Sequence, residues 1–253
     1  MRVYLLLACL VGAVMTSWSV SAAEIKVLTA GAFKPVVTEV VADFEKQSGH
    51  TVTVVGDTAG GLLKRINGGE TFDLVFITAG ALDELTKSGK VATGSTATLA
   101  RVGVGVAVKR GAVLPDISTV AAFQRTMLAA RAVAYIDPAA GGSSGIYISS
   151  LFEKMGIADR VKPKAVLVPG GLVAQRLMDD QADVAIHQIS EILAVPGAVL
   201  VGPLPAEIQN YTVYSGGLRA NLSDASAASA LLTTFSSPAA RGMMKAKGLD
   251  ALP

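Results

Sequence analysis

Four times along this chain a turn of small residues leads into a helical pattern, usually after a short apolar run, and this unit constrains the fold more than any other feature. The four turns lie at residues 31–34, 58–61, 141–145 and 170–171. Alternation of buried strands with helices is typical of a mainly parallel sheet that carries helices on both faces. The sequence therefore predicts an α/β fold.

The stretch from residue 137 to residue 147, DPAAGGSSGIY, contains the clearest of these turns. It follows an apolar run at 132–136 and leads into an amphipathic segment, so we expect a helix whose first turn holds Ser143, Ser144 and Gly145. Backbone N–H groups at a helix start have no partner inside the helix, and hydroxyl groups beside them add donors. An anion is the expected ligand.

The first 23 residues have the pattern of a signal peptide. Arg2 precedes an apolar core at 3–15, and small residues at 21–23 precede Glu24 in the arrangement that signal peptidase cleaves. The single cysteine, Cys9, lies within this leader. We therefore expect a secreted mature chain without disulfides or cysteine ligands.

Composition argues against two kinds of partner. The chain has 22 Lys and Arg and 20 Asp and Glu residues; without Arg2, the mature chain would have 21 basic and 20 acidic residues, a formal charge of +1. This balance and an aromatic content of 5% argue against nucleic acid. After the leader no apolar stretch approaches the length of a membrane span, so no membrane insertion is expected.

Two familiar catalytic or cofactor motifs do not fit. The glycine turns match neither a dinucleotide fingerprint nor a phosphate loop with its lysine. The segment GGSSG at 141–145 is one residue short of the strained Gly-x-Ser-x-Gly turn of a serine hydrolase, and no acid partner is placed for it.

The order of the predicted elements favours two lobes. Predicted strands of the first lobe lie at 24–29, 51–55 and 72–77, and those of the second at 132–136, 164–168 and 183–186. A long valine and glycine run at 100–109 carries the chain into the second lobe. If the helical tail packs against the first lobe, the chain crosses between the lobes twice. We expect lobe 1 at 24–100 and 206–253, lobe 2 at 101–205, and a ligand cleft between them.

The candidate ligand-binding residues gather where predicted strands end, because ligands of open parallel sheets bind outside the carboxyl ends of the strands. Thr58, Ser143 and Ser144 contribute hydroxyl donors. The remaining candidates supply backbone groups or follow strands: Ala32, Phe33, Gly60, Gly61, Gly145, Gly170, Gly171, His187 and Gln188.

His187 follows the predicted strand at 183–186 and is the histidine expected near the cleft. Two roles are open for it: a hydrogen bond at the strand end, or ligand contact and proton transfer near neutral pH. A single histidine cannot assemble a usual zinc site, so no metal is expected. Ser190 is expected to cap the next helix, and Glu191 is a second candidate base. Three cations near the turns, Lys34, Arg65 and Arg176, are expected to be solvated.

Several segments, in their order along the chain, resemble the molybdate-binding-protein family of periplasmic solute receptors. These segments are the first strand with Ala30-Gly31-Ala32 and residues 58–66, 72–80, 144–147 and 236–240. The resemblance implies two doubly wound lobes joined by two crossing strands, the type II periplasmic-binding-protein architecture. It also implies a periplasmic protein that closes on an anion and delivers it to an inner-membrane ABC permease.

Departures from that family favour an organic anion over molybdate. The family usually has a serine where this chain has Ala32 and Phe33, a serine-rich turn where it has 58–61, and a tyrosine where it has His187 and Gln188. Lost hydroxyls would leave a tetrahedral oxyanion short of donors, and a buried unpaired charge is costly. His187 and Gln188 can instead grip a planar carboxylate, as in a di- or tricarboxylate.

The sequence is compatible with two functions. The first is a periplasmic binding protein for such an anion; a sensor that binds without delivery fits the same residues. The alternative is an isomerase, because aconitate isomerase resembles the same receptor family. Such an enzyme, without a cofactor, would move the double bond of aconitate or a related unsaturated polycarboxylate, with His187 or Glu191 as the base. Binding ranks first, since most chains of this architecture are receptors.

Replacing Ser144 with alanine tests the predicted anion site. The Ser144→Ala variant should bind its anion about fivefold more weakly, a loss of about 1 kcal/mol, because one hydroxyl donor is removed. Its thermal unfolding should stay near that of the wild type. Calorimetric titration with molybdate, sulfate, citrate and aconitate measures the affinity, and unchanged affinity for every anion that binds would contradict the prediction.

Overall fold

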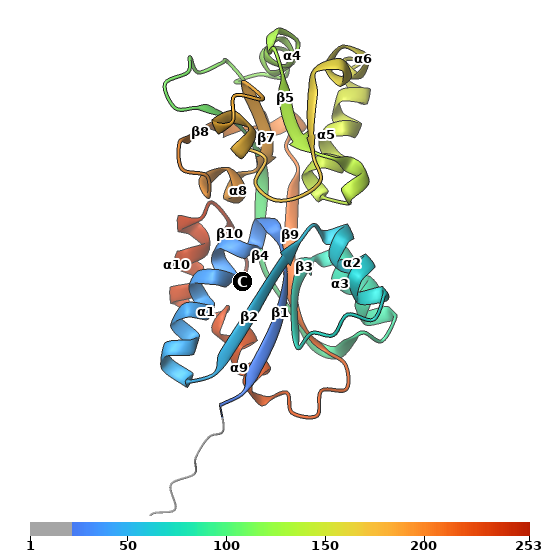
Figure 1. The fold of residues 1–253 in the computed structure, drawn as a ribbon, viewed down its shortest axis with the longest axis vertical. Helices are drawn as coiled ribbons and strands as arrows, with labels where there is room; N and C mark the ends of the chain where they lie inside the picture. The colour runs from blue at the N-terminus through green and yellow to red at the C-terminus, as the bar shows by residue number, and fades with distance from the viewer. Residues whose placement is uncertain (1–21) are drawn as a thin grey trace, which may run out of the picture.

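The computed structural model describes residues 22–253 as an α/β structure with two lobes arranged along its longest axis (Figure 1). The predicted fold class is confirmed. The expected leader, residues 1–23, falls outside the described residues apart from Ala22 and Ala23. None of the helices between residues 22 and 253 is both long and apolar enough to cross a membrane.

Lobe 1, the lower lobe in Figure 1, is built on three parallel strands. β1 (Glu24–Ala30) lies between β2 (Thr51–Asp57) and β3 (Leu74–Thr78). Its helical segments are η1 (Gly31–Phe33), α1 (Lys34–Ser48), α2 (Ala59–Asn67), α3 (Ala79–Lys87), α9 (Ser226–Thr234) and α10 (Pro238–Ala246). The ends of α1 match the signals in the sequence: Pro35 stands in its first turn, and Gly49, directly after its last residue, has a φ of 73°, which is typical of a helix C-cap.

Lobe 2, the upper lobe, repeats this arrangement. β5 (Val133–Ile136) lies between β6 (Ala165–Val168) and β7 (Val184–Gln188), parallel to both. Its helical segments are α4 (Val120–Ala129), η2 (Pro138–Ala140), α5 (Ser143–Lys154), α6 (Ala158–Val161), η3 (Lys162–Lys164), α7 (Gln175–Met178) and α8 (Ile189–Leu193). η4 (Ala206–Ile208) follows, where the chain returns to lobe 1. Gly142 is the N-cap of α5, so Ser143, Ser144 and Gly145 form its first turn, as predicted.

Two strands join the lobes into a ten-stranded sheet with the order β2-β1-β3-β9-β4-β7-β5-β6. β4 (Val91–Lys109) pairs antiparallel with β9 (Tyr211–Arg219) in lobe 1 and with β7 in lobe 2. β8 (Ala198–Pro203) and β10 (Asp250–Ala251) also pair with β4. In Figure 1, β4 and β9 run side by side through the waist of the molecule.

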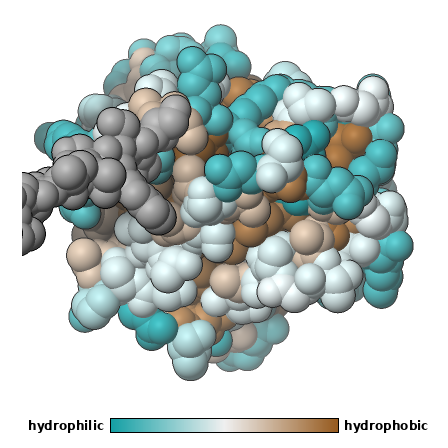
Figure 2. Space-filling model, turned by 90° about the horizontal axis from the view of Figure 1, so that it is seen from below, coloured by the Kyte–Doolittle hydropathy of each residue, from teal (hydrophilic) through white to brown (hydrophobic). Residues whose placement is uncertain are grey.

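Each lobe has its own hydrophobic core. The core residues of lobe 1 fall between Ile25 and Val102 and between Tyr214 and Leu249, whereas those of lobe 2 fall within 104–204. These cores support the expected boundaries, 24–100 with 206–253 and 101–205, which we propose for the two lobes. On the outer end of lobe 1, hydrophobic residues show between hydrophilic ones (Figure 2).

Two local predictions need correction. β4 begins at Val91 rather than near residue 100, because its first residues pair with the distant strand β9, which a local pattern does not reveal. The helix expected directly after the turn at 169–171 begins only at Gln175. Gly171 has a φ of 81° and Leu172 is 39% exposed, so this segment is a loop at the cleft.

Gly145 determines how closely α5 approaches β5. An added Cβ at this position would overlap the carbonyl oxygen of Ile136, the last residue of β5. The backbone of Gly145 is not left-handed, so close packing alone requires glycine there. This contact places the start of α5 against the end of its neighbouring strand.

Gly145→Ala should therefore lower the free energy of unfolding by about 1–3 kcal/mol, because the first turn of α5 must move away from β5. Gly80→Ala is a matched control in the first turn of α3, where an added Cβ has nothing within 4 Å. The control should be neutral or stabilising by up to about 1 kcal/mol. Denaturant unfolding compares the two, and equal stability would contradict the packing role.

Candidate functional site

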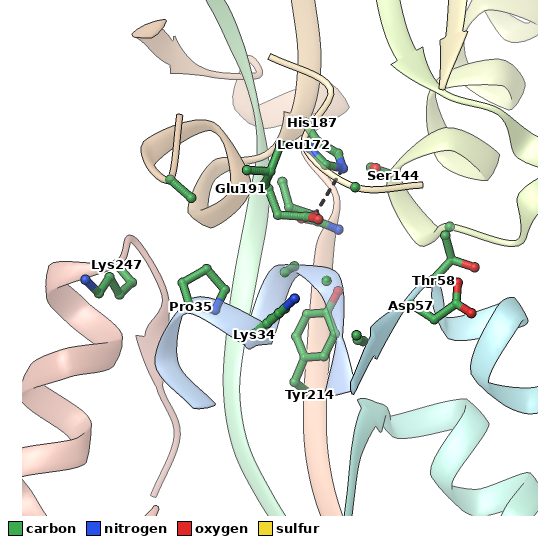
Figure 3. A pocket seen from close by; sticks show the side chains of 18 of the residues that line it. Lys34, Pro35, Asp57, Thr58, Ser144, Leu172, His187, Glu191, Tyr214 and Lys247 are labelled. Carbon is green, nitrogen blue, oxygen red and sulfur yellow. Dashed lines mark hydrogen bonds and ion pairs between the residues drawn. The ribbon is translucent and has the colours of Figure 1, made fainter. Parts of the chain in front are cut away.

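A cleft of about 800 Å³ lies between the lobes (Figure 3). Lobe 1 contributes η1, the start of α1, the end of β2 and part of β9; lobe 2 contributes the start of α5, the end of β7 and α8. The sequence-predicted candidates that line it are Ala32, Thr58, Ser143, Ser144, Gly171, His187, Gln188 and Glu191. The fold thus brings together residues from five separate parts of the chain.

The start of α5 presents hydrogen-bond donors to this cleft. Ser143 and Ser144 line it, and the backbone N–H groups of the first turn have no partner within the helix. The helix dipole adds partial positive charge at the same end. Gly145 packs against β5 and is absent from the lining. This end of α5 is therefore suited to bind a carboxylate.

The start of α1 forms a second donor region on the opposite lobe. Gly31 and Ala32 of η1 line the cleft. Phe33 is instead fully buried in the core of lobe 1, with its ring stacked 5.9 Å from that of Tyr214. Phe33 therefore supports the cleft wall from behind.

The turn at the start of α2 is held by contacts within the protein. The Thr58 hydroxyl donates to the carbonyl oxygen of Ala140 at 2.5 Å, and the Gly60 N–H donates to that of Gly141 at 3.0 Å, both across the lobes. The Gly61 N–H donates to Thr58 Oγ1 at 2.9 Å. Gly60 and Gly61 do not line the cleft, although Thr58 does. These contacts close one edge of the cleft.

His187 and Glu191 form a buried pair on the lobe 2 side of the cleft, the upper wall in Figure 3. His187 lies near the end of β7 and Glu191 lies four residues later in α8, with 3.1 Å between His187 Nε2 and Glu191 Oε2. The two residues are 2% and 6% exposed. Glu191 lies between His187 and the lower wall in Figure 3. The carboxyl group therefore faces the ligand space, with the imidazole behind it.

Burial determines the protonation of this pair. It lowers the pKa of His187 to about 3 and raises the pKa of Glu191 to about 8. The cause is the lost hydration of the charged forms. Near neutral pH both side chains are neutral, so the Glu191 carboxyl O–H donates to His187 Nε2.

Tyr214 of β9 faces this pair from the lower wall (Figure 3). Burial raises the pKa of Tyr214 above its usual range; the charge of Glu191 adds to the rise and the Ser143 hydroxyl opposes it. The phenol therefore remains a protonated donor. The sequence does not indicate that Tyr214 is a hydrogen-bond donor at the cleft, because this residue lies in a mainly apolar strand pattern. Its direction follows from the pairing of β9 with β3.

Lys34 supplies positive charge at the same wall, although the sequence suggested a solvated side chain. A second lysine at the cleft, Lys247, is paired with Glu39 at 2.8 Å. Among residues 22–253, Lys34 has no carboxylate within 4 Å. The acid at the cleft edge, Asp57, lies 3.4 Å from an arginine of α2. Lys34 is therefore free to pair with a ligand.

Gln188 offers a further polar contact. Its amide nitrogen donates to the hydroxyls of Ser143 at 3.1 Å and Thr212 at 2.8 Å, whereas its Oε1 is buried without a partner among the described residues. Gln188 lines the cleft, so this oxygen can accept a hydrogen bond from a hydroxyl or protonated carboxyl group of a ligand. Gly171 also lines the cleft, but Gly170 does not.

Two lobes joined by crossing strands, with strand ends and helix starts facing a cleft between them, define the class of two-lobed solute-binding proteins. The chain belongs to the bacterial extracellular solute-binding protein family, whose model matches residues 25–250. It is 34% identical over 233 residues to an aconitate isomerase from a Pseudomonas species, covering 90% of this chain and 87% of that protein.

Solved structures show the same fold. The periplasmic molybdate-binding protein of Azotobacter vinelandii matches with a TM-score of 0.77 at 20% identity, covering 90% of this chain and 99% of that one. A sulfate-binding protein of Mycobacterium tuberculosis matches with a TM-score of 0.71 at 16% identity, covering 91% and 87%. The family resemblance predicted from the sequence is confirmed.

The buried pair gives stability a characteristic dependence on pH. The Glu191 pKa is raised from 4.5 to about 8, so its contribution to stability is complete below 4.5 and is lost as the pH rises to about 8. The His187 pKa is lowered from 6.5 to about 3, so its contribution is complete above 6.5 and is lost as the pH falls to about 3. The two slopes oppose each other from 4.5 to 6.5, and only the Glu191 slope remains from 6.5 to 8.

Glu191→Gln should therefore remove a fall in the free energy of unfolding between pH 6.5 and 8 that the wild type shows. Denaturant unfolding at successive pH values measures this difference. Glu153→Gln, at an exposed glutamate 2.9 Å from Lys162, is the matched control and should retain the fall. Parallel curves for wild type and Glu191→Gln would contradict the assigned burial effect.

Proposed function

We propose that this protein is a cofactor-independent isomerase that moves the double bond of aconitate or a related unsaturated polycarboxylate. The observation that carries the proposal is the buried His187–Glu191 pair, whose carboxyl group faces the cleft. Burial of the pair costs stability. Anion binding does not require a buried side chain that can gain and lose a proton, whereas proton transfer does.

The pair can carry out an allylic proton transfer. When the shared proton moves from Glu191 to His187, the Glu191 carboxylate can take a proton from the methylene carbon of the bound acid. The electrons of that C–H bond spread over the allylic unit, which consists of the methylene carbon and the two carbons of the double bond. Glu191 then returns the proton to the far carbon of the former double bond. One C–H bond breaks, one C–H bond forms, and the double bond shifts by one carbon. No oxidant, reductant or cofactor is consumed.

The lobe 1 side of the cleft supplies positive charge and hydrogen-bond donors that stabilise the anionic intermediate. Negative charge develops on the substrate as the C–H bond breaks, and donors fixed in advance lower the energy of that state. Lys34 provides an unpaired cation and Tyr214 a protonated hydroxyl, and both point into the cleft from the lower wall in Figure 3. The imidazolium of His187 offsets the charge from the other side.

The distribution of donors supports a substrate with several carboxylates. One donor region is the start of α5, and a second is the start of α1 with Lys34. They come from different elements around one cleft, which suits carboxylates on neighbouring carbons. The 34% identity to an aconitate isomerase over 90% of the chain supports the same substrate class.

A receptor for a di- or tricarboxylate is the second candidate. The membership in a solute-binding family and the donors at two helix starts favour it. In that case an inner-membrane ABC permease would receive the ligand. For both functions the proposed compartment is the periplasm, reached through the leader at residues 1–23. The sequence analysis ranks the receptor first, and the burial of Glu191 is our reason for proposing the isomerase ahead of it.

Proton NMR of cis-aconitate with the purified protein tests the proposal. The wild type should produce trans-aconitate, and Glu191→Gln should slow this conversion by at least about 100-fold, because an amide cannot accept the allylic proton. Glu153→Gln, at the surface of α5, should convert at the wild-type rate.

A flat time course for the wild type would exclude this substrate. Calorimetric binding of citrate or aconitate by such an inactive protein would then favour the receptor. Conversion by Glu191→Gln at the wild-type rate would contradict the assignment of the base.

A further inference from the structure

We infer that Ser190 and Gly31 are positioning residues that hold the Glu191 carboxyl group in place only when the two lobes are closed. The inference rests on the proposed proton transfer, and it adds that closure of the lobes fixes the position of the Glu191 carboxyl group beside His187. Ser190 and Glu191 belong to α8 of lobe 2, whereas Gly31 belongs to η1 of lobe 1.

Ser190 does not cap its helix, contrary to the sequence prediction. The N-cap of α8 is Gln188, and no side chain makes a capping hydrogen bond there. The Ser190 hydroxyl is instead buried and donates to the carbonyl oxygen of Ala32, in η1, at 2.7 Å. This bond links the residue beside Glu191 to the opposite lobe, so it can exist only while the lobes are together.

Gly31 provides the space that Glu191 occupies. A Cβ on Gly31 would lie 2.5 Å from Glu191 Oε1. Gly31 is not among the glycines with positive φ, so its backbone conformation does not itself require glycine. The absence of a side chain therefore matters for the carboxyl group of the other lobe.

The other edge of the cleft closes through backbone contacts that also depend on small residues. The Gly60 N–H donates to the Gly141 carbonyl oxygen at 3.0 Å, and a Cβ on Gly60 would lie 2.7 Å from Gly141 Cα. Closure at this edge involves no catalytic candidate. The Ser190 edge differs because the residue next to the contact is the proposed base.

Several charged or titratable groups line the same cleft as Glu191. They are His187 of β7, Tyr214 of β9, Lys34 and Glu39 of α1, Asp57 of β2 and Lys247 after α10. η1 and β8, which pack against α8, contribute none, and β4 carries only Arg101 and Lys109, which are paired with Asp250 and Asp180. Loss of the closed arrangement would expose the carboxyl group to water and favour its charged form.

The test compares Ser190→Ala and Gly31→Ala with two controls. Ser150→Ala changes an exposed serine of α5, and Gly80→Ala adds a Cβ with nothing within 4 Å. Carbon-detected NMR of the carboxyl groups gives the pKa of Glu191 directly, with Glu191→Gln identifying its signal. Assays with cis-aconitate give kcat and KM, and thermal unfolding shows that each variant is folded.

In Ser190→Ala and Gly31→Ala, the pKa of Glu191 should fall from about 8 toward its ordinary value. Their kcat should fall by about 10-fold to 100-fold, because the base is misplaced, with a smaller change in KM. Both controls should match the wild type. A purely structural role would reduce the amount of active protein without moving the pKa.

The experiment distinguishes failure of the positioning role from failure of the proposed isomerisation. Folded Ser190→Ala and Gly31→Ala proteins with an unchanged pKa for Glu191 would overturn the positioning role, whatever the activity. A lowered pKa in these variants, together with a wild type that leaves cis-aconitate unchanged, would support the positioning role and reject the proposed isomerisation.

Discussion

Burial of a carboxyl group beside an imidazole, without a fixed counter-charge, is the constraint on which the rest of the cleft depends. Each charged form loses its hydration in this position, so Glu191 retains its proton and His187 remains neutral near pH 7. A neutral pair admits an anionic ligand that a carboxylate would repel. Positive charge and neutral donors then have to come from the other groups of the cleft, and Lys34, Tyr214 and the start of α5 supply them.

The fold brings these groups together by means of small residues at its closest approaches. Gly60 and Gly141 touch across the lobes, and Gly105 of β4 lets α8 pack within reach of the sheet, since a Cβ there would lie 2.9 Å from Ile189. Each glycine gives up side-chain packing so that two backbone segments or a functional side chain can come close. The same turns that make a family of anion receptors recognisable thus also shape the space around Glu191.

The sequence predicted the fold class and the gathering of strand ends at one cleft, because hydrophobic periodicity and turn residues are local signals. It also identified Ser143, Ser144, His187 and Glu191 as candidates. It did not place the side chains of Tyr214 and Lys34 at the cleft, because their direction depends on the pairing of β9 and on the packing of α1. It also placed Phe33 at the ligand, since position after a strand does not determine which side chain turns into the core. Ser190 was assigned a local cap because its real partner is 158 residues away.

In the proposed reaction Glu191 carries one proton, shielded from water, between two carbons of the same bound molecule. cis-Aconitate with deuterium in its methylene group, incubated with the protein in ordinary water for the first turnovers, tests this most directly. Mass spectrometry and proton NMR of the product should find part of the deuterium on the carbon that was vinylic in the substrate, because a carboxyl group that is 6% exposed exchanges slowly with water. Product in which every transferred position carries a solvent proton would contradict the account.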